Sequence, residues 1–349
     1  MAKRFMIYGA TGYTGKLVSK AAKQAGMSPL LAGRNEARLK GIAAQHSFDY
    51  QAISLDEPEA LEAGLSQVDA VLNIAGPFSQ TCKPMLDACI KTGTHYFDIT
   101  GEIDVFEYCA SMDAKAKEAG IMVMPGTGFD VVPSDCLAAH MKARMPDATE
   151  LVLGISGFGG MSRGTAKTGI ESIGQGTRIR KDGRIVRARG ALAREIDFGK
   201  GLVESVAVGW GDVATAYHST GIPNISVYFE ANAQMKQMAG MGGLMRWVLS
   251  LGPMQRMLKR RIDQEPEGPD EVARETGRME LYGEASNEKG ETVSSRLTTP
   301  EGYRLTAMTS LEIVARVLND EGRAGFQTPS AVFGPDFILE FPDTSRQDL

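Results

Sequence analysis

The segment Gly9-Ala10-Thr11-Gly12-Tyr13-Thr14-Gly15 decides the fold of the N-terminal part of this chain. The apolar run 4–8 precedes it directly, and Lys16-Leu17-Val18 continues it in a helical pattern. Glycines between a strand and a helix let backbone N–H groups contact a pyrophosphate at the helix N-terminus, where the helix dipole favours an anion. A glycine-rich turn without a ligand is the alternative. We expect a dinucleotide phosphate to bind at Gly9, Thr11, Gly12, Tyr13, Thr14 and Gly15.

Short apolar runs alternate with helical patterns through residues 1–130. The runs are 4–8, 29–32, 48–52, 69–74, 95–98 and 121–124, with helical patterns such as 16–25 and 36–45 between them. This alternation is typical of an α/β domain, a Rossmann-type doubly wound parallel sheet with right-handed crossovers. We predict such a domain over residues 1–132.

The pattern changes after Pro133 to longer strand-like runs and hairpin signals. Asp182-Gly183 between two short runs predicts a two-residue hairpin turn. The runs 151–156, 225–230, 278–285 and 292–297 predict a mostly antiparallel second sheet, and 231–262 predicts a long helical stretch. We expect an α+β domain for substrate binding or dimerisation over 133–308. A C-terminal helix at 309–318 and tail then fill 309–349, with packing against the first domain an open possibility.

The composition excludes several classes of protein. The chain has 349 residues, 43% of them hydrophobic, and its 38 basic and 43 acidic residues give a net charge of −5, so we expect no nucleic-acid partner. The four cysteines have no metal-ligand spacing, and the four histidines form no HExxH pattern, so no metal site is expected. Neither a signal peptide nor an apolar run of about 18 residues is present, which favours a cytoplasmic protein.

The residues after the second predicted strand indicate the kind of dinucleotide. NAD sites place a carboxylate there, but this chain has Ala32-Gly33-Arg34-Asn35. The guanidinium of Arg34 suits the 2′-phosphate of NADP, and the GxxGxxG spacing is also found in NADP-dependent relatives of the fold. Arg34 as a plain surface charge is the alternative. Asn35 is also a candidate N-cap, and Arg38 is either a second phosphate contact or a solvated residue.

Two further turns are predicted to line the cofactor, because they follow strands at the carboxyl edge of the sheet. The first contains Ala75, Gly76, Pro77 and Phe78. The second contains Thr100 and Gly101.

Several segments together resemble the saccharopine dehydrogenase-like oxidoreductases, especially their trans-acting enoyl reductase branch. The most specific are Asp98-Ile99-Thr100-Gly101-Glu102 and Gly128-Phe129-Asp130-Val131-Val132-Pro133-Ser134-Asp135, with Ser162-Arg163-Gly164-Thr165 and Thr328-Pro329-Ser330-Ala331 as weaker matches. The resemblance implies an NADP-binding domain, a second α+β domain often used for dimerisation, and hydride transfer between them. It does not imply saccharopine as the substrate, because function depends on the site rather than the fold.

The candidate catalytic residues are those able to donate a proton or stabilise charge next to the cofactor. The Tyr-x-x-x-Lys pair of short-chain reductases is absent, because none of the nine tyrosines has a lysine four residues later. Asp98, Glu102, Asp130, Ser134 and Asp135 follow the fifth and sixth strands, where capping of the next helix is their alternative role. Lys167 is the first choice as proton donor, with a solvated lysine as the alternative. His218 lies between two strand-like runs of the second domain.

Six methionines concentrate between Met235 and Met257, next to the basic residues Arg256, Lys259, Arg260 and Arg261. The spacing of Met235, Met238, Met241 and Met245 places them on one helical face. A core or dimer helix, a lid over a lipophilic substrate and a peripheral membrane contact through 235–261 all fit this composition.

We therefore predict an NADP(H)-dependent oxidoreductase that reduces a small or lipophilic substrate, with enoyl reduction preferred and a homodimer expected. Imine reduction of an amino-acid adduct is one alternative. A non-catalytic NADP(H)-sensing protein is the other.

Overall fold

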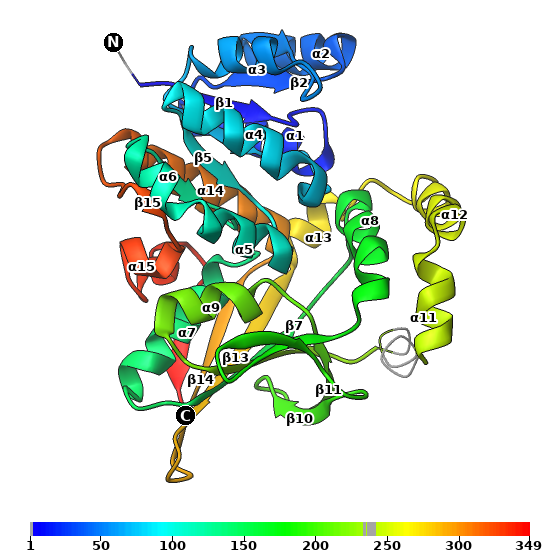
Figure 1. Cartoon of the computed structure of the whole chain (residues 1–349), viewed down its shortest axis with the longest axis vertical. Coiled ribbons are helices and arrows are strands. Elements are labelled where there is room, and N and C mark those ends of the chain that lie inside the picture. The colour runs from blue at the N-terminus through cyan, green and yellow to red at the C-terminus, as the bar shows by residue number, and fades with distance from the viewer. Residues whose placement is uncertain (1–2, 233–234, 236–241) are drawn as a thin grey trace. The chain divides into compact units, whose positions relative to one another are not determined.

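The computed structural model of the chain describes residues 3–232, 235 and 242–349 (Figure 1). The chain divides into two compact units, one of residues 1–132 with 303–332 and the other of residues 133–302 with 333–349. The first boundary falls where the sequence pattern changes. The C-terminal part is not a separate segment, because residues 303–332 join the first unit and 333–349 return to the second.

The first unit contains a parallel sheet of seven strands in the order β15-β6-β5-β4-β1-β2-β3. Six strands coincide with the predicted runs, and β15 is added from the C-terminal part of the chain. The strands are β1 (Phe5–Tyr8), β2 (Leu30–Gly33), β3 (Tyr50–Ala52), β4 (Ala70–Asn73), β5 (His95–Asp98), β6 (Met122–Met124) and β15 (Gly325–Phe326). The helices are α1 (Tyr13–Gln24), α2 (Glu36–His46), α3 (Pro58–Leu65), α4 (Phe78–Thr92), α5 (Ile103–Ser111), α6 (Asp113–Glu118), α14 (Gly302–Leu318) and α15 (Pro329–Phe333).

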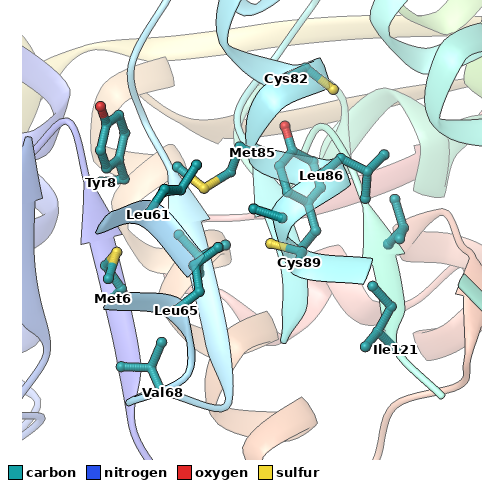
Figure 2. Close-up of a cluster of buried hydrophobic side chains, with 14 of the residues drawn as sticks. Met6, Tyr8, Leu61, Leu65, Val68, Cys82, Met85, Leu86, Cys89 and Ile121 are labelled. Atoms are coloured by element: carbon teal, nitrogen blue, oxygen red, sulfur yellow. The ribbon is translucent and has the colours of Figure 1, made fainter. Parts of the chain in front are cut away.

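The core of the first unit lies between the sheet and its helices. Met6 and Tyr8 of β1 meet Leu61 and Leu65 of α3 and Met85 of α4 in one buried cluster (Figure 2). Burying each of these large apolar side chains stabilises the fold by about 1.5–3 kcal/mol relative to exposing it. Ile7 and Leu72 alternate with the clustered strand residues and are also fully buried, so both faces of the sheet are covered.

The second unit contains a mostly antiparallel sheet, as predicted, with one parallel pair between β7 and β12. The predicted Asp182-Gly183 hairpin is confirmed and joins β8 to β9. The strands are β7 (Glu150–Ser156), β8 (Arg178–Lys181), β9 (Arg184–Arg187), β10 (Ala193–Asp197), β11 (Leu202–Val208), β12 (Asn224–Glu230), β13 (Arg278–Ser286), β14 (Thr292–Pro300) and β16 (Ser345–Asp348). The helices are α7 (Val132–Arg144), α8 (Arg163–Ser172), η1 (Ile173–Gln175), α9 (Asp212–Thr220), α11 (Gly243–Ser250), α12 (Gly252–Ile262), α13 (Glu271–Thr276) and η2 (Phe337–Glu340).

Three sequence-based expectations about helices need correction. The stretch 231–262 is not one helix: α11 and α12 are separate, because Leu251 is extended and Gly252-Pro253 start a new helical turn. Met238 and Met241 lie outside the described residues. The late helix begins at Gly302 rather than Thr309. His218 lies between two strands, β11 and β12, as predicted, but on a helix, α9, that the sequence pattern did not indicate.

Among the described residues, no helix is both long enough and apolar enough to cross a membrane. All four cysteines are free and buried.

Candidate functional site

The loop between β1 and α1 is fixed by backbone hydrogen bonds. The N–H of Gly9 donates to the carbonyl of Ala32 at 2.9 Å, and the N–H of Gly12 donates to the carbonyl of Gly9 at 3.1 Å. Gly12 is the N-cap of α1 and has no side chain with which to cap it. The positive end of the helix dipole is therefore presented at an exposed glycine.

A side chain would have a different effect on the structure at each of the three glycines of this loop. Gly9 has φ +89°, and a Cβ there would lie 2.8 Å from the backbone nitrogen of Ala75. A Cβ at Gly15 would lie 2.4 Å from the carbonyl oxygen of Gly9, so only glycine lets α1 approach the loop. At Gly12 the nearest atom to such a Cβ is 3.5 Å away, so the fold itself tolerates a side chain there. The space over Gly12 is open, as the predicted binding of a pyrophosphate at the helix N-terminus requires.

Arg34 follows β2 directly and is exposed. Burial raises the pKa of Tyr8 at the end of β1, and the nearby charge of Arg34 partly opposes this rise. The guanidinium therefore lies on the same edge of the sheet as the glycine loop. Asn35 is the N-cap of α2, where its side chain accepts from the N–H of Arg38 at 3.0 Å. The N-cap role of Asn35 is confirmed. The cofactor contacts of Asn35 and Arg34 stay predictions, and for Arg38 a second phosphate contact and a solvated residue both stay open.

The turn after β4 is held by a carboxylate. Both oxygens of Glu102 accept backbone N–H groups at the start of α4, from Phe78 at 2.8 Å and from Ser79 at 2.9 Å. The hydroxyl of Thr81 donates to the carbonyl of Ala75 at 2.7 Å. Glu102 is thus engaged in capping α4 and in fixing the turn that contains Gly76 and Pro77. The expected alternative is capping of the next helix, α5, but the Glu102 side chain makes no capping hydrogen bond there and caps the earlier helix α4.

The edge after β5 and β6 is organised around Asp98, which is fully buried. Its carboxylate accepts from the hydroxyl of Tyr96 at 2.6 Å and from the N–H groups of Thr100 and Gly126, each at 2.9 Å. Burial raises its pKa to about 6, although these hydrogen bonds act in the opposite direction. Asp98 therefore ties two strand ends together.

Asp130 lies against the backbone of Gly101. A Cβ added to Gly101 would come within 3.0 Å of an Asp130 carboxylate oxygen. The structure thus brings the predicted catalytic residue Asp130 next to the predicted cofactor-binding turn of Thr100 and Gly101, within the first unit.

Helix α14 contributes residues that sequence reasoning missed. The ring of Tyr303 lies edge-on to the ring of Tyr13 in the glycine loop, with centroids 5.1 Å apart and an interplanar angle of 89°. The hydroxyl of Thr306 accepts the N–H of Phe129 at 2.9 Å. No local pattern links residues this far apart in the chain, so only the fold reveals the contacts.

Ser134 and Asp135 belong to a second polar cluster, in the second unit. Asp135 is fully buried and accepts a hydrogen bond from the hydroxyl of Ser219 on α9. Asp212, at the start of α9, is also fully buried. Burial raises its pKa to about 7 and the charge of Asp135 adds to the rise, whereas Ser134 lowers it. Two buried carboxyl groups thus lie beside the predicted residue Ser134.

We predict that Asp212→Asn stabilises the protein at about pH 8 by roughly 2 kcal/mol or more, and much less near pH 4. The ordinary pKa of aspartate, 3.8, applies in the unfolded chain, whereas the folded value is about 7. Because the folded state holds the Asp212 proton more tightly, this group favours folding fully at pH values below 3.8. Its contribution to the free energy of unfolding is lost as the pH rises through 7. Asparagine does not titrate. Chemical unfolding at both pH values measures the difference, and Asp182→Asn at an exposed hairpin turn is the control. A pH-independent effect at Asp212 would contradict the prediction.

The other two catalytic candidates lie at different places in the second unit. Lys167, on α8, forms an ion pair with Asp263 after α12, with Nζ and Oδ1 2.5 Å apart. His218 is exposed on α9. Lys167 and His218 therefore lie on different helices, α8 and α9.

The first unit has the strand order and the glycine loop of a dinucleotide-binding domain. Residues 5–124 match the family model of the saccharopine dehydrogenase NADP-binding domain, and this part of the chain is a domain of that kind. NADP(H) is the cofactor that this domain binds. The resemblance seen in the sequence motifs is confirmed for the domain.

Known relatives agree with this assignment over part of their length. A trans-acting enoyl reductase of Mycobacterium leprae is 36% identical over 151 residues, 40% of this chain and 35% of that protein. A saccharopine dehydrogenase-like oxidoreductase of Mus musculus is 31% identical over 160 residues, 40% of this chain and 37% of that protein. These matches thus span little more than a third of the relatives.

One solved structure is similar over the whole chain. Apo saccharopine dehydrogenase (L-Glu forming) from Saccharomyces cerevisiae matches with a TM-score of 0.65 and covers 99% of this chain and 100% of its own. The sequence identity is 11%, so this likeness supports the fold alone.

Proposed function

We propose that the chain is an NADPH-dependent reductase that transfers hydride to a lipophilic substrate, with the C=C bond of an enoyl group preferred. The geometry of Gly9, Gly12 and Gly15 carries the proposal, because it leaves an open approach to the N-terminus of α1. The preference for an enoyl group rests on the relatives named as enoyl reductases. Bound NADPH would supply the hydride.

The residues of the first unit would bind and orient the cofactor. The N-terminal turn of α1 would hold the pyrophosphate, and Arg34 would pair with the 2′-phosphate. Glu102 fixes the turn of Gly76 and Pro77 by accepting two N–H groups, so this turn is rigid before the cofactor arrives. Asp130, beside Gly101, is the candidate in this unit for holding a proton near the edge of the sheet.

A substrate-dependent fall in NADPH absorbance tests the activity. A long-chain enoyl thioester is expected to support turnover, whereas a mixture of an amino acid and an aldehyde, which forms an imine, is not. Turnover of the imine alone would favour the saccharopine-type alternative. NADPH binding without turnover of either substrate would contradict a reductase and favour a sensor.

Arg34→Ala is expected to weaken NADPH binding about 10–100-fold and to leave NADH binding nearly unchanged, because only NADPH has the 2′-phosphate. The dissociation constants follow from fluorescence titration of the nicotinamide. Lys40→Ala, on the exposed side of α2, is the control for loss of one positive charge. If Arg34→Ala lost equal affinity for NADPH and NADH, or if Lys40→Ala lost as much NADPH affinity as Arg34→Ala, Arg34 would not be the residue that binds the 2′-phosphate.

A further inference from the structure

The helices α11 and α12 of the second unit are fixed on one side by α8 and η1, beside which they lie (Figure 1). Lys259 of α12 pairs with the carboxylate of Glu171 on α8. A Cβ added to Gly174 of η1 would lie 2.8 Å from Cβ of Ser250 on α11. Both helices therefore have a packed side and an outward side.

The outward side combines apolar and cationic residues. Trp247 is 60% exposed, Met245 54%, Met257 43% and Leu251 40%. Arg256 and Arg260, and Met257 and Arg261, are four residues apart and lie on one side of α12, where all four are exposed, whereas Met254 and Leu258 are half-buried. We call the following seven residues the α11–α12 patch: Met245, Trp247, Leu251, Arg256, Met257, Arg260 and Arg261.

The charge of this region differs from that of the chain. Between Glu230 and Asp263 the sequence contains no acidic residue, although the whole chain has a net charge of −5. A second copy of the chain is a poor occupant, because a twofold interface through this patch would bring two copies of the same cationic patch, without an acidic residue, against each other. An anionic lipid surface fits both components: arginines contact phosphate groups, and tryptophan and methionine enter the boundary between headgroups and acyl chains.

We propose that the α11–α12 patch binds the surface of an anionic lipid bilayer. The arginines lie at the level of the headgroup phosphates, and the ring of Trp247 inserts with Met245, Leu251 and Met257 beside it. The two helices lie along the surface and do not cross it. This proposal is independent of the reductase activity, since neither NADPH nor substrate takes part.

Co-sedimentation of the full chain with vesicles tests the proposal. The chain is expected to bind vesicles of phosphatidylcholine with phosphatidylglycerol, to bind phosphatidylcholine alone far more weakly, and to be released by salt. Replacing Arg256, Arg260 and Arg261 by Gln is expected to weaken binding about 100-fold, or about fivefold per arginine. The matched control replaces three exposed arginines around β9, Arg184, Arg187 and Arg189, by Gln, and is expected to bind like wild type.

Tryptophan fluorescence supplies a second measurement. Emission is expected to shift to shorter wavelength on binding, and Trp247→Phe is expected to abolish the shift while the protein stays folded. The proposal would be overturned if the chain did not bind anionic vesicles, as expected if the arginines serve only an acidic protein. An equal loss of vesicle binding in both triple variants would also overturn it, as would an unchanged emission shift in Trp247→Phe. A far-ultraviolet circular dichroism spectrum checks that each variant folds.

Discussion

Gly12→Ala is expected to fold like wild type and to bind NADPH at least tenfold more weakly. The backbone of Gly12 has φ −75° and ψ 170°, which alanine adopts without strain. Its Cβ would have one neighbour within 4 Å, the carbonyl oxygen of Gly9 at 3.5 Å, so the free energy of unfolding should change by less than about 1 kcal/mol. The same methyl group would occupy the space through which a pyrophosphate approaches the helix N-terminus.

Gly15→Ala is the matched variant, in which both the stability of the fold and NADPH binding are expected to be affected. Its Cβ would lie 2.4 Å from the oxygen of Gly9 and 2.8 Å from Cα of Ala10, both backbone atoms. Because the loop has to move, we expect a loss of about 2 kcal/mol or more in stability together with the loss of NADPH binding.

Thermal unfolding and NADPH titration of the two glycine variants separate the roles. Wild-type affinity in Gly12→Ala would show that the cofactor does not approach the loop there. Wild-type stability in Gly15→Ala would contradict the close approach of α1 to Gly9.

The glycine loop could be predicted because its requirements are local. Gly9, Gly12 and Gly15 lie within one strand-loop-helix unit, and their spacing expresses both the turn and the helix contact. The N-cap role of Asn35 is local in the same way. The sequence therefore predicted the first sheet and the phosphate loop together.

Contacts between distant segments could not be predicted from the pattern. Tyr303 reaches Tyr13, and Thr306 reaches Phe129, only because α14 returns to the first unit. The same holds for Asp135, whose partner Ser219 lies on a helix that the sequence pattern did not indicate. Buried polar pairs of this kind leave no periodic pattern in the sequence from which they could be predicted.

The methionine-rich stretch shows how one proline changes an interpretation. The spacing of its apolar residues alone predicts a single long helix. Pro253 lacks an N–H and its ring clashes with the carbonyl four residues earlier, so α11 cannot continue through it; in the first turn of α12, where no intrahelical N–H bond is needed, proline is tolerated. The short second helix then presents Arg256, Arg260 and Arg261 on one exposed face, which the sequence indicated only as a basic run.

Asp98→Ala is expected to destabilise the first unit by about 3 kcal/mol or more. The substitution leaves the hydroxyl of Tyr96 and the N–H groups of Thr100 and Gly126 without their buried acceptor, and each such group costs about 1–3 kcal/mol. The lost volume of the carboxyl group adds a cavity. Denaturant unfolding followed by circular dichroism measures the change.

Asp98→Asn is the control that separates hydrogen bonding from charge. Both backbone N–H groups donate to Oδ1, which asparagine retains, so we expect a smaller loss than for alanine. The folded pKa of about 6 exceeds the ordinary 3.8, so the aspartate favours folding below about pH 4 and loses this contribution as the pH rises through 6. The free energy of unfolding of Asp98→Asn, relative to that of wild type, should therefore be higher at about pH 7 than at about pH 4. Equal destabilisation by both variants at every pH would show that Asp98 does not act as this buried acceptor.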